Sequence, residues 1–216
     1  FNEYLKMAHQ SSASMLELVN DILDLSKLQA GKFEIQKEKS SIKDLIDNRI
    51  AFYKISGDSR KVIMDKYFDK NLPEFADFDP QALKQVLNNF ISNALKFTSS
   101  GGSVKVSAFV AGADGYWPTI DTNKYPAFPV KSDIPLYKKT LCVVVTDTGI
   151  GIPDKNLREL FHTYKQAKIS PVNKDEKGTG LGLVIAKGIT EAHNGKVGAV
   201  SKEGKGSSFF FTIPLS

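Results

Sequence analysis

The segment that most constrains the fold of this chain is residues 87–99, which read LNNFISNALKFTS. Asn89, Asn93 and Lys96 are spaced i, i+4 and i+7, so on a helix they form one polar line along a single face. Apolar residues cover the rest of that helix and predict that it is largely buried: Leu87, Phe90, Ile91, Ala94 and Leu95. Polar groups on a buried helix are costly unless other polar groups lie against them. The pattern therefore indicates either a hydrogen-bonded amide pair in the core or a polar ligand beside the helix.

Two glycine-rich segments later in the chain favour the ligand. Residues 147–153 read DTGIGIP, and residues 178–183 read GTGLGL. Glycines allow close backbone approach and positive φ, and free N–H groups at a helix start can hold phosphate oxygens. The second segment lacks the Gly-Lys-Ser/Thr of a Walker loop, and no strand ends directly before it, as a dinucleotide fingerprint requires. The second segment therefore predicts a phosphate-binding loop that is neither a Walker loop nor a dinucleotide fingerprint.

In this order, the three segments resemble the N, G1 and G2 boxes of the histidine-kinase ATP-binding domain. Residues 161–164, FHTY, are similar to the F box between the last two. The family belongs to the ATPase superfamily shared by type II topoisomerases, heat-shock chaperones and mismatch-repair proteins. The resemblance covers nearly the whole chain. It implies a two-layer α/β sandwich of the Bergerat type, with one mixed sheet covered by helices on one face.

The resemblance also implies the residues that bind ATP. Asp147 is the expected partner of the adenine amine, supported by Thr148 and Gly151. A carboxylate at a strand end in an apolar pocket suits that amine and discriminates against guanine, and without such a partner it is costly to bury. For an isolated Asp-x-Gly, a simple turn after a strand would be the alternative. The further nucleotide-binding residues that the resemblance implies are Phe97, Gly149, Ile152, Tyr164, Lys177, Gly178, Thr179, Gly180, Leu181, Gly182 and Leu183.

At the phosphate end, Asn89 is the expected Mg²⁺ ligand through its amide oxygen. Asn93 is expected to contact the phosphates, and Lys96 to neutralise their charge. Lys177 stands where the second box of the family often begins with glycine. The core of that box is intact, but the resemblance does not fix the geometry of the lid, which we place at residues 165–177. The ATP-hydrolysing relatives carry a glutamate base at the position of Asn89. Because an amide cannot take a proton, we expect poor hydrolysis and transfer to an outside nucleophile.

The first hypothesis is therefore the catalytic domain of a sensor histidine kinase of the hybrid type. It would bind Mg-ATP and pass the γ-phosphoryl group to a histidine, for relay to the aspartate of a response-regulator receiver domain. The alternative is a non-catalytic nucleotide-binding or dimerising module that regulates a kinase. A free-standing ATPase is a third hypothesis, which Asn89 disfavours.

Residues 1–30 are predicted to form one long helix, which ends at Gly31. An a/d stripe runs along it, at Leu5, Ala8, Ser12, Met15, Val19, Ile22 and Ser26. Residues 20–31 are similar to the end of the second dimerisation helix of hybrid histidine kinases. His9 lacks the neighbours of a phosphoacceptor histidine, so we expect that histidine, and the first helix, to be absent from this chain. We divide the chain into a dimerisation helix, 1–31, which implies a homodimer, and an ATP-binding domain, 32–216.

Other patterns outline the rest of the domain. Strands are predicted at 33–36, 62–68, 103–110, 140–147, 197–201 and 207–213, and further helices begin at Asp79-Pro80, Pro153 and Leu181. Residues 111–139 are an insert rich in aromatic residues and proline. If its flanking strands pair, it leaves the hairpin roughly 20 Å from Asp147. We expect either a docking surface or a self-packed loop there.

Composition excludes several classes of protein. The 216 residues suffice for one domain, or one domain with a helical arm. The net charge is +5, but the 29 Lys and Arg are scattered among 24 Asp and Glu, so nucleic-acid binding is not predicted. One cysteine, Cys142, fits a reducing compartment. Neither a signal sequence nor an apolar run of about 18 residues is present. We therefore expect a cytoplasmic domain without membrane contact.

Overall fold

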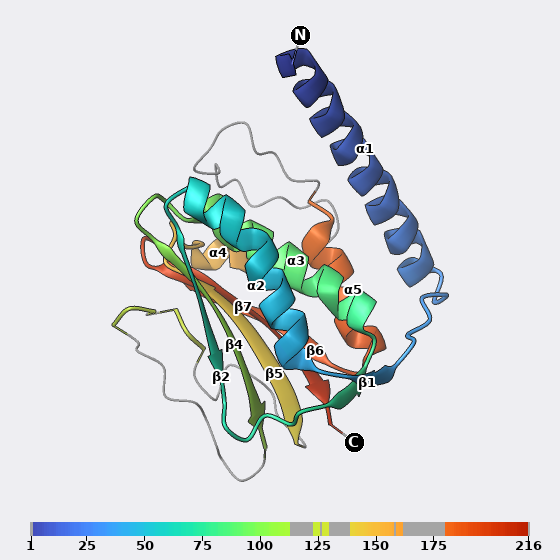
Figure 1. Cartoon of the computed structure of the whole chain (residues 1–216). Helices are drawn as coiled ribbons and strands as arrows, with labels where there is room; N and C mark the ends of the chain where they lie inside the picture. Colours follow the sequence, from blue (N-terminus) through green and yellow to red (C-terminus); the bar gives the residue numbers. More distant parts are fainter. Residues whose placement is uncertain are drawn as a thin grey trace.

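The computed structural model describes residues 2–112, 123–125, 127–129, 139–157, 159–161 and 180–215. Its main sheet has five strands in the spatial order β2, β4, β5, β7, β6 (Figure 1). These strands are β2 Ile63–Phe68, β4 Ser103–Ala111, β5 Thr140–Asp147, β7 Gly206–Pro214 and β6 Lys196–Lys202. β2 pairs with β4 in parallel and the other pairs are antiparallel, so the sheet is mixed, as predicted.

Helices cover one face of this sheet, which confirms the predicted α/β sandwich (Figure 1). They are α2 Ile42–Ser59, α3 Pro80–Phe97 and α5 Gly182–Ala192. The apolar residues of α3 that the sequence marked as core are all buried. Phe90 lies at the centre of the interface, with its ring centroid 5.6 Å from that of Phe209 and 6.3 Å from that of Phe211 on β7. The polar line on α3 is therefore held in place by a rigid core.

Asp79 connects the start of α3 to two other parts of the chain. As the N-cap, its Oδ1 accepts hydrogen bonds from the N–H groups of Gln81 and Ala82, at 3.0 and 2.9 Å. Its Oδ2 accepts one from the N–H of Gln36, and its own N–H donates to Nε2 of His193 at 3.1 Å. The predicted Asp-Pro helix start is thus confirmed.

His193 is fixed as one neutral tautomer at the end of α5. Its Nδ1 lies 2.8 Å from the carbonyl oxygen of Ile189, and its Nε2 accepts the N–H of Asp79. Because a carbonyl only accepts, Nδ1 carries the proton. Burial lowers the pKa of His193 below its ordinary value of 6.5, against the opposing effects of the Ile189 carbonyl and the Asp79 carboxylate. His193 is therefore a structural residue.

In a His193→Gln variant, the free energy of unfolding is expected to depend less on pH than in the wild type. The unfolded chain binds a proton on this histidine more readily than the folded domain, so the free energy of unfolding falls as the pH drops below 6.5. Urea denaturation at pH 7.5 and 5.5 measures this loss, which should be smaller in the variant than in the wild type. At pH 7.5 the variant should lose about 1–2 kcal/mol for the broken hydrogen bonds. Equal pH dependence in both proteins would contradict the assignment.

The region before α3 departs from the sequence prediction. Residues 33–36 alternate but form no strand: Phe33 and Ile35 pack against the core, and no strand in the described part of the chain pairs with this segment. The first strand is instead β1, Glu38–Ser40, which pairs with β3, Ala76–Phe78, in a separate antiparallel sheet. β3 was not predicted. The helix predicted from Pro153 is a single turn, α4 Asp154–Leu157.

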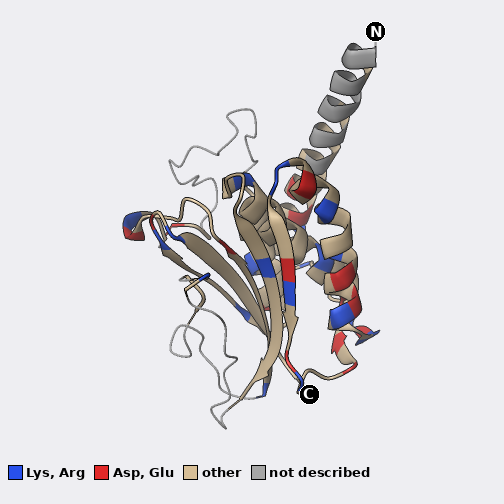
Figure 2. Cartoon of the chain, turned by 60° about the vertical axis from the view of Figure 1, so that its left-hand side comes forward, with Lys and Arg blue, Asp and Glu red and all other residues tan. Residues whose placement is uncertain are grey.

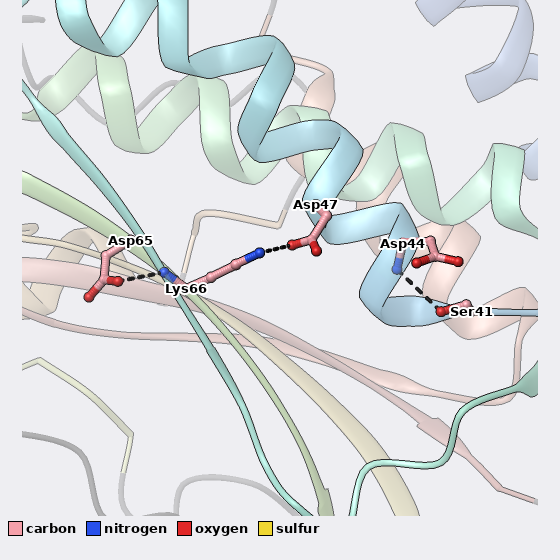
Figure 3. A network of polar contacts seen from close by, with 5 residues as sticks. All are labelled: Ser41, Asp44, Asp47, Asp65 and Lys66. Atoms are coloured by element: carbon pink, nitrogen blue, oxygen red, sulfur yellow. Dashed lines mark hydrogen bonds and ion pairs between the residues drawn. The ribbon is translucent and has the colours of Figure 1, made fainter.

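Local polar contacts hold α2 in position (Figure 3). Its N-cap Ser41 accepts a hydrogen bond from the N–H of Asp44 at 3.2 Å. Lys66 on β2 forms an ion pair with Asp47 on the next turn of α2. Both partners of this pair are partly exposed, so the cap contributes more to the position of α2 than the ion pair does.

The opposite face of the sheet is covered by part of the insert. In the pairing of β4 with β5, Val104 lies opposite Asp147 at one end and Ala111 lies opposite Thr140 at the other. The insert therefore leaves the hairpin at the end away from Asp147, as predicted. Tyr125 and Phe128 are buried against an apolar cluster formed by Phe109, Ala111, Cys142, Val144 and Phe210. The described part of the insert is therefore neither a free docking surface nor a loop packed only on itself.

Helix α1, Asn2–Gln29, matches the predicted long helix and extends beyond the rest of the chain (Figure 1). Its C-terminal turns contact the domain, because Leu25 is in the core and Gln85 on α3 donates a hydrogen bond to Asp24 at 2.9 Å. The other side of α1 exposes apolar side chains, with Met15 71% exposed and Ile22 46% exposed.

Charged residues of both signs are interspersed along the same elements (Figure 2). No helix in the described part of the chain is long and apolar enough to cross a membrane.

Candidate functional site

The carboxylate of Asp147 is buried at the end of β5, where only 2% of the residue is exposed. Its Oδ1 accepts two hydrogen bonds, from the N–H of Gly149 at 2.8 Å and from the N–H of Ser207 at 3.2 Å. Burial raises the pKa of Asp147 from 3.8 to about 7, although these two hydrogen bonds act in the opposite direction. Both hydrogen bonds end on Oδ1, so among the described residues neither of these donors occupies Oδ2, which can accept from a ligand.

The loop after Asp147 lies against the C-terminal end of α3. The N–H of Ile150 donates to the carbonyl of Phe97 at 3.2 Å. A Cβ on Gly149 would lie 2.3 Å from that same carbonyl oxygen, so only glycine fits. Thr148 accepts a hydrogen bond from the N–H of Ser103 at 2.9 Å and thereby fixes the loop to β4. The first two predicted segments therefore meet at Phe97.

The turn between β6 and β7 holds the other side of this loop. Gly151 has a φ of +68°, and a Cβ there would lie 2.1 Å from the carbonyl oxygen of Lys202. The N–H of Gly204 donates to the carbonyl of Ile150 at 2.7 Å. The N–H of Ile152 donates to the hydroxyl of Ser201 at 2.7 Å. The loop therefore packs between the C-terminal end of α3 and the turn between β6 and β7, which follows it by about fifty residues in the sequence.

Asn89 joins α3 to the start of α5. Its Nδ2 donates to the carbonyl of Gly182 at 2.9 Å, and a Cβ on Gly182 would lie 2.7 Å from Oδ1 of Asn89. Leu181 precedes α5 as its N-cap without a side-chain capping bond. The first N–H groups of a helix have no partners within the helix and attract anions. Asn89 therefore lies beside a helix start suited to phosphate.

Asn93 and Lys96 continue the polar line from Asn89 and are both partly exposed. The Nζ of Lys96 lies 5.4 Å from the centroid of the Phe97 ring. Asn89 and Phe97 are separated by about 12 Å along the helix axis, at about 1.5 Å per residue. One helix thus contributes to both ends of the candidate site, which suits an extended ligand such as a nucleoside diphosphate.

The remaining predicted residues divide into two groups. Gly180 has a φ of +74°, Ile152 and Leu181 are buried, and Leu183 packs against the core. The predicted lid and its neighbours lie outside the described residues, and these include Tyr164, Lys177, Gly178 and Thr179.

Three residues of the site were missed by the sequence analysis, because Ser201 and Ser207 fall in predicted strands and Gly206 falls between them, with no sign of a ligand site. Gly206 has a φ of +100°, and its Cα is so close to Asp147 that a Cβ would lie 2.0 Å from the carbonyl oxygen of that residue. Ser207 donates its N–H to the Asp147 carboxylate, and Ser201 holds Ile152. Their places depend on the pairing of β5 with β7 and of β7 with β6.

Comparison with known proteins finds histidine kinases among the proteins that are similar to this chain. It is 33% identical over 215 residues to the non-motile and phage-resistance protein of Caulobacter vibrioides and 31% identical to histidine protein kinase DivJ of the same organism. It is also 33% identical to sensor protein kinase WalK of Staphylococcus aureus. These alignments cover 100%, 100% and 98% of this chain, but only 23%, 31% and 44% of the relatives. The chain therefore spans less than half the length of these relatives.

Solved structures show the same fold. Full-length ShkA, in complex with AMPPNP, superposes with a TM-score of 0.75 at 25% identity, over 100% of this chain and 39% of that one. The histidine kinase AdeS of Acinetobacter baumannii has a TM-score of 0.68 at 17% identity, over 98% of this chain and 84% of that one. Residues 78–216 match the family model for histidine kinase-, DNA gyrase B- and HSP90-like ATPases. The chain belongs to this ATPase family.

Proposed function

We propose that this chain is the ATP-binding catalytic part of a two-component sensor histidine kinase. In the whole protein it would transfer the γ-phosphoryl group of Mg-ATP to a histidine on a dimerisation helix, for relay to a response-regulator aspartate. The observation that carries the proposal is the buried Asp147 carboxylate, whose Oδ1 is fixed by two N–H groups while Oδ2 takes part in neither bond. The names of the relatives and the fold of ShkA support it.

At the base end of the site, Asp147 would accept the exocyclic amine of adenine through Oδ2. A carboxylate at this depth is stabilised by a donor from a ligand. Guanine carries a carbonyl where adenine carries the amine, and two acceptors would face each other. Gly149 and Gly151 would let the base approach the backbone of the loop. The proposal therefore predicts selectivity for adenine.

At the phosphate end, Asn89, Asn93 and Lys96 would hold the phosphates together with Mg²⁺. The residues fit this group, because Nδ2 of Asn89 is occupied by the Gly182 carbonyl and only Oδ1 is an amide acceptor. When bound, Mg²⁺ would neutralise phosphate charge. Asn89 cannot act as a general base for water, which favours transfer to a histidine over hydrolysis.

An Asn89→Ala variant is expected to lose most of the contribution of Mg²⁺ to ADP binding. Titration calorimetry with and without Mg²⁺ measures this contribution, which should fall about tenfold as one ligand oxygen is removed. Ser92→Ala is the matched control, since Ser92 is exposed on the same helix and donates only to the Asn89 carbonyl. An Mg²⁺ effect of wild-type size in Asn89→Ala would exclude Asn89 as the metal ligand.

Phosphoryl transfer is tested with γ-labelled ATP. The chain alone should remain unlabelled. Addition of a dimerisation hairpin that carries a phosphoacceptor histidine should give acid-labile label on the hairpin. Binding of ADP without any transfer would favour the alternative, a non-catalytic regulatory module, and steady-state release of phosphate would favour a free-standing ATPase.

The proposal includes a homodimer and a cytoplasmic location, where ATP and response regulators are available. The division into a dimerisation helix, 1–31, and an ATP-binding domain, 32–216, belongs to it as well. The exposed apolar side of α1, with Leu5, Met15 and Ile22, supports pairing with a second copy. Analytical ultracentrifugation of the wild type and an Ile22→Glu variant tests this, because a monomeric wild type would exclude pairing through α1.

A further inference from the structure

The hydroxyl of Ser201 on β6 uses all of its hydrogen-bonding capacity. It donates to the carbonyl of Gly206 at 2.8 Å and accepts the N–H of Ile152 at 2.7 Å. Its oxygen also lies 2.9 Å from the hydroxyl of Ser207. A serine hydroxyl has one proton and two acceptor lone pairs. Since its proton goes to Gly206, its two lone pairs receive Ile152 and Ser207.

These contacts connect Ser201 to Asp147 by two routes. The first runs through Ile152, near the end of the loop that begins at Asp147. The second runs through Ser207, whose N–H donates to Oδ1 of Asp147 at 3.2 Å. Gly151 and Gly206 leave no space between the loop and the turn for a side chain, so a shift at Ser201 is transmitted to both.

We propose that Ser201 is a positioning residue that fixes the orientation of the Asp147 carboxylate, and thereby the selectivity of the site for adenine over a 6-oxo purine. This inference rests on the proposed adenine site and adds a residue that does not itself touch the base. With Oδ1 held by Ser207 and Gly149, Oδ2 keeps one direction toward the ligand. Without the Ser201 hydroxyl, the turn and the loop lose a shared anchor.

The test compares ADP with IDP, which carries an oxygen in place of the adenine amine. Titration calorimetry gives the affinity of each ligand for the wild-type chain and for Ser201→Ala. ADP binding should weaken about fivefold in Ser201→Ala, because a carboxylate that is no longer held in one orientation makes a poorer hydrogen bond to the adenine amine. IDP binding should stay unchanged, so the ratio of the two affinities should fall by the same factor. A structural defect that only reduces the folded fraction would lower the apparent affinities for ADP and IDP by the same factor and leave their ratio unchanged.

Ser208→Ala is the matched control. Ser208 follows on β7 and is buried, with its hydroxyl 2.7 Å from that of Thr146, so its loss also breaks a hydroxyl pair. Neither residue of this pair contacts the loop through its hydroxyl, and the ADP-to-IDP ratio should keep its wild-type value. Ser201→Thr retains the hydroxyl and should restore the ratio. The cysteine side chain is close in size to serine but is a weak acceptor, so Ser201→Cys should lower the ADP-to-IDP ratio. This variant replaces Ser201→Ala in the test if Ser201→Ala fails to fold.

An unchanged ratio in both Ser201→Ala and Ser201→Cys would overturn the assignment of Ser201. The failure of the proposed function would look different, because the wild-type chain itself would then not bind ADP, and the positioning role would fall with it.

Discussion

An Asp147→Asn variant is expected to bind ADP about a hundredfold more weakly than the wild type, or worse, and to bind IDP more tightly. Oδ1 of Asp147 accepts two N–H groups. The amide oxygen of asparagine must keep that place, because an NH₂ group there would face two donors. The NH₂ group therefore replaces Oδ2 and directs a donor toward the adenine amine, whereas the oxygen of IDP can accept from it.

Titration calorimetry with ADP and IDP measures this reversal. Asp77→Asn is a suitable control, because Asp77 is an exposed carboxylate on β3 and its loss should leave both affinities unchanged. If Asp147→Asn keeps the wild-type preference for ADP, Oδ2 does not contact the base.

Asp147→Asn is also expected to stabilise the ligand-free domain above pH 7. The pKa of Asp147 is about 7 in the folded state and 3.8 ordinarily, so the folded domain holds the proton more tightly than the unfolded chain. The free energy of unfolding of the wild type therefore falls as the pH rises from about 4 to about 7. At about 1.4 kcal/mol per unit, the full cost is on the order of 4 kcal/mol. Urea denaturation at pH 5 and pH 8 should show a larger advantage of Asp147→Asn at pH 8.

A Gly151→Ala variant is expected to lose about 3 kcal/mol of stability and most of its ADP binding. Alanine at a φ of +68° costs about 1–2 kcal/mol. Its Cβ would also lie 2.1 Å from the carbonyl oxygen of Lys202, so the loop and the turn must separate. Separation breaks the hydrogen bonds Gly204–Ile150 and Ile152–Ser201, each worth about 1 kcal/mol.

Gly204→Ala isolates the conformational part of this effect. Gly204 has a φ of +75°, but a Cβ there would have no neighbouring atom within 4 Å, so alanine should cost only about 1–2 kcal/mol. Urea denaturation of both variants measures the difference. Equal losses of unfolding free energy in the two variants would mean that the contact between the loop and the turn does not contribute to stability.

Features encoded locally were predictable from the sequence. Asp79 and Pro80 mark the start of α3, and the spacing of Asn89, Asn93 and Lys96 marks its polar line, because caps and helical periodicity involve residues close in sequence. The resemblance alone assigned Asn89 and the second glycine segment to one nucleotide site, and the structure places Asn89 against Gly182.

Features that depend on long-range pairing were not predictable. The alternation of Phe33 and Ile35 reflects burial of one side of an extended segment, whereas the actual strand, β1, has the polar sequence EKS and no apolar signal. Ser207 reaches Asp147 only because β7 pairs with β5, and Ser201 comes near that site only because β6 pairs with β7. A turn sequence gives no information about such a neighbour.

The position of the insert could have been inferred in part. The strand around Cys142 and Val144 is continuously apolar, which is typical of a sheet buried on both faces. With the helices on one face, some other segment had to cover the second. The aromatic residues of the insert, including Tyr125 and Phe128, take that place.

The most direct test of the account is the unfolding free energy of the wild-type chain with and without Mg-ADP. We predict that Mg-ADP at a hundred times its dissociation constant stabilises the folded state by about 2.7 kcal/mol, and that IDP gives a smaller effect at the same concentration. An unfolding free energy that stays the same up to millimolar Mg-ADP would contradict the proposal that Asp147, Asn89 and the two glycine segments form a working nucleotide site.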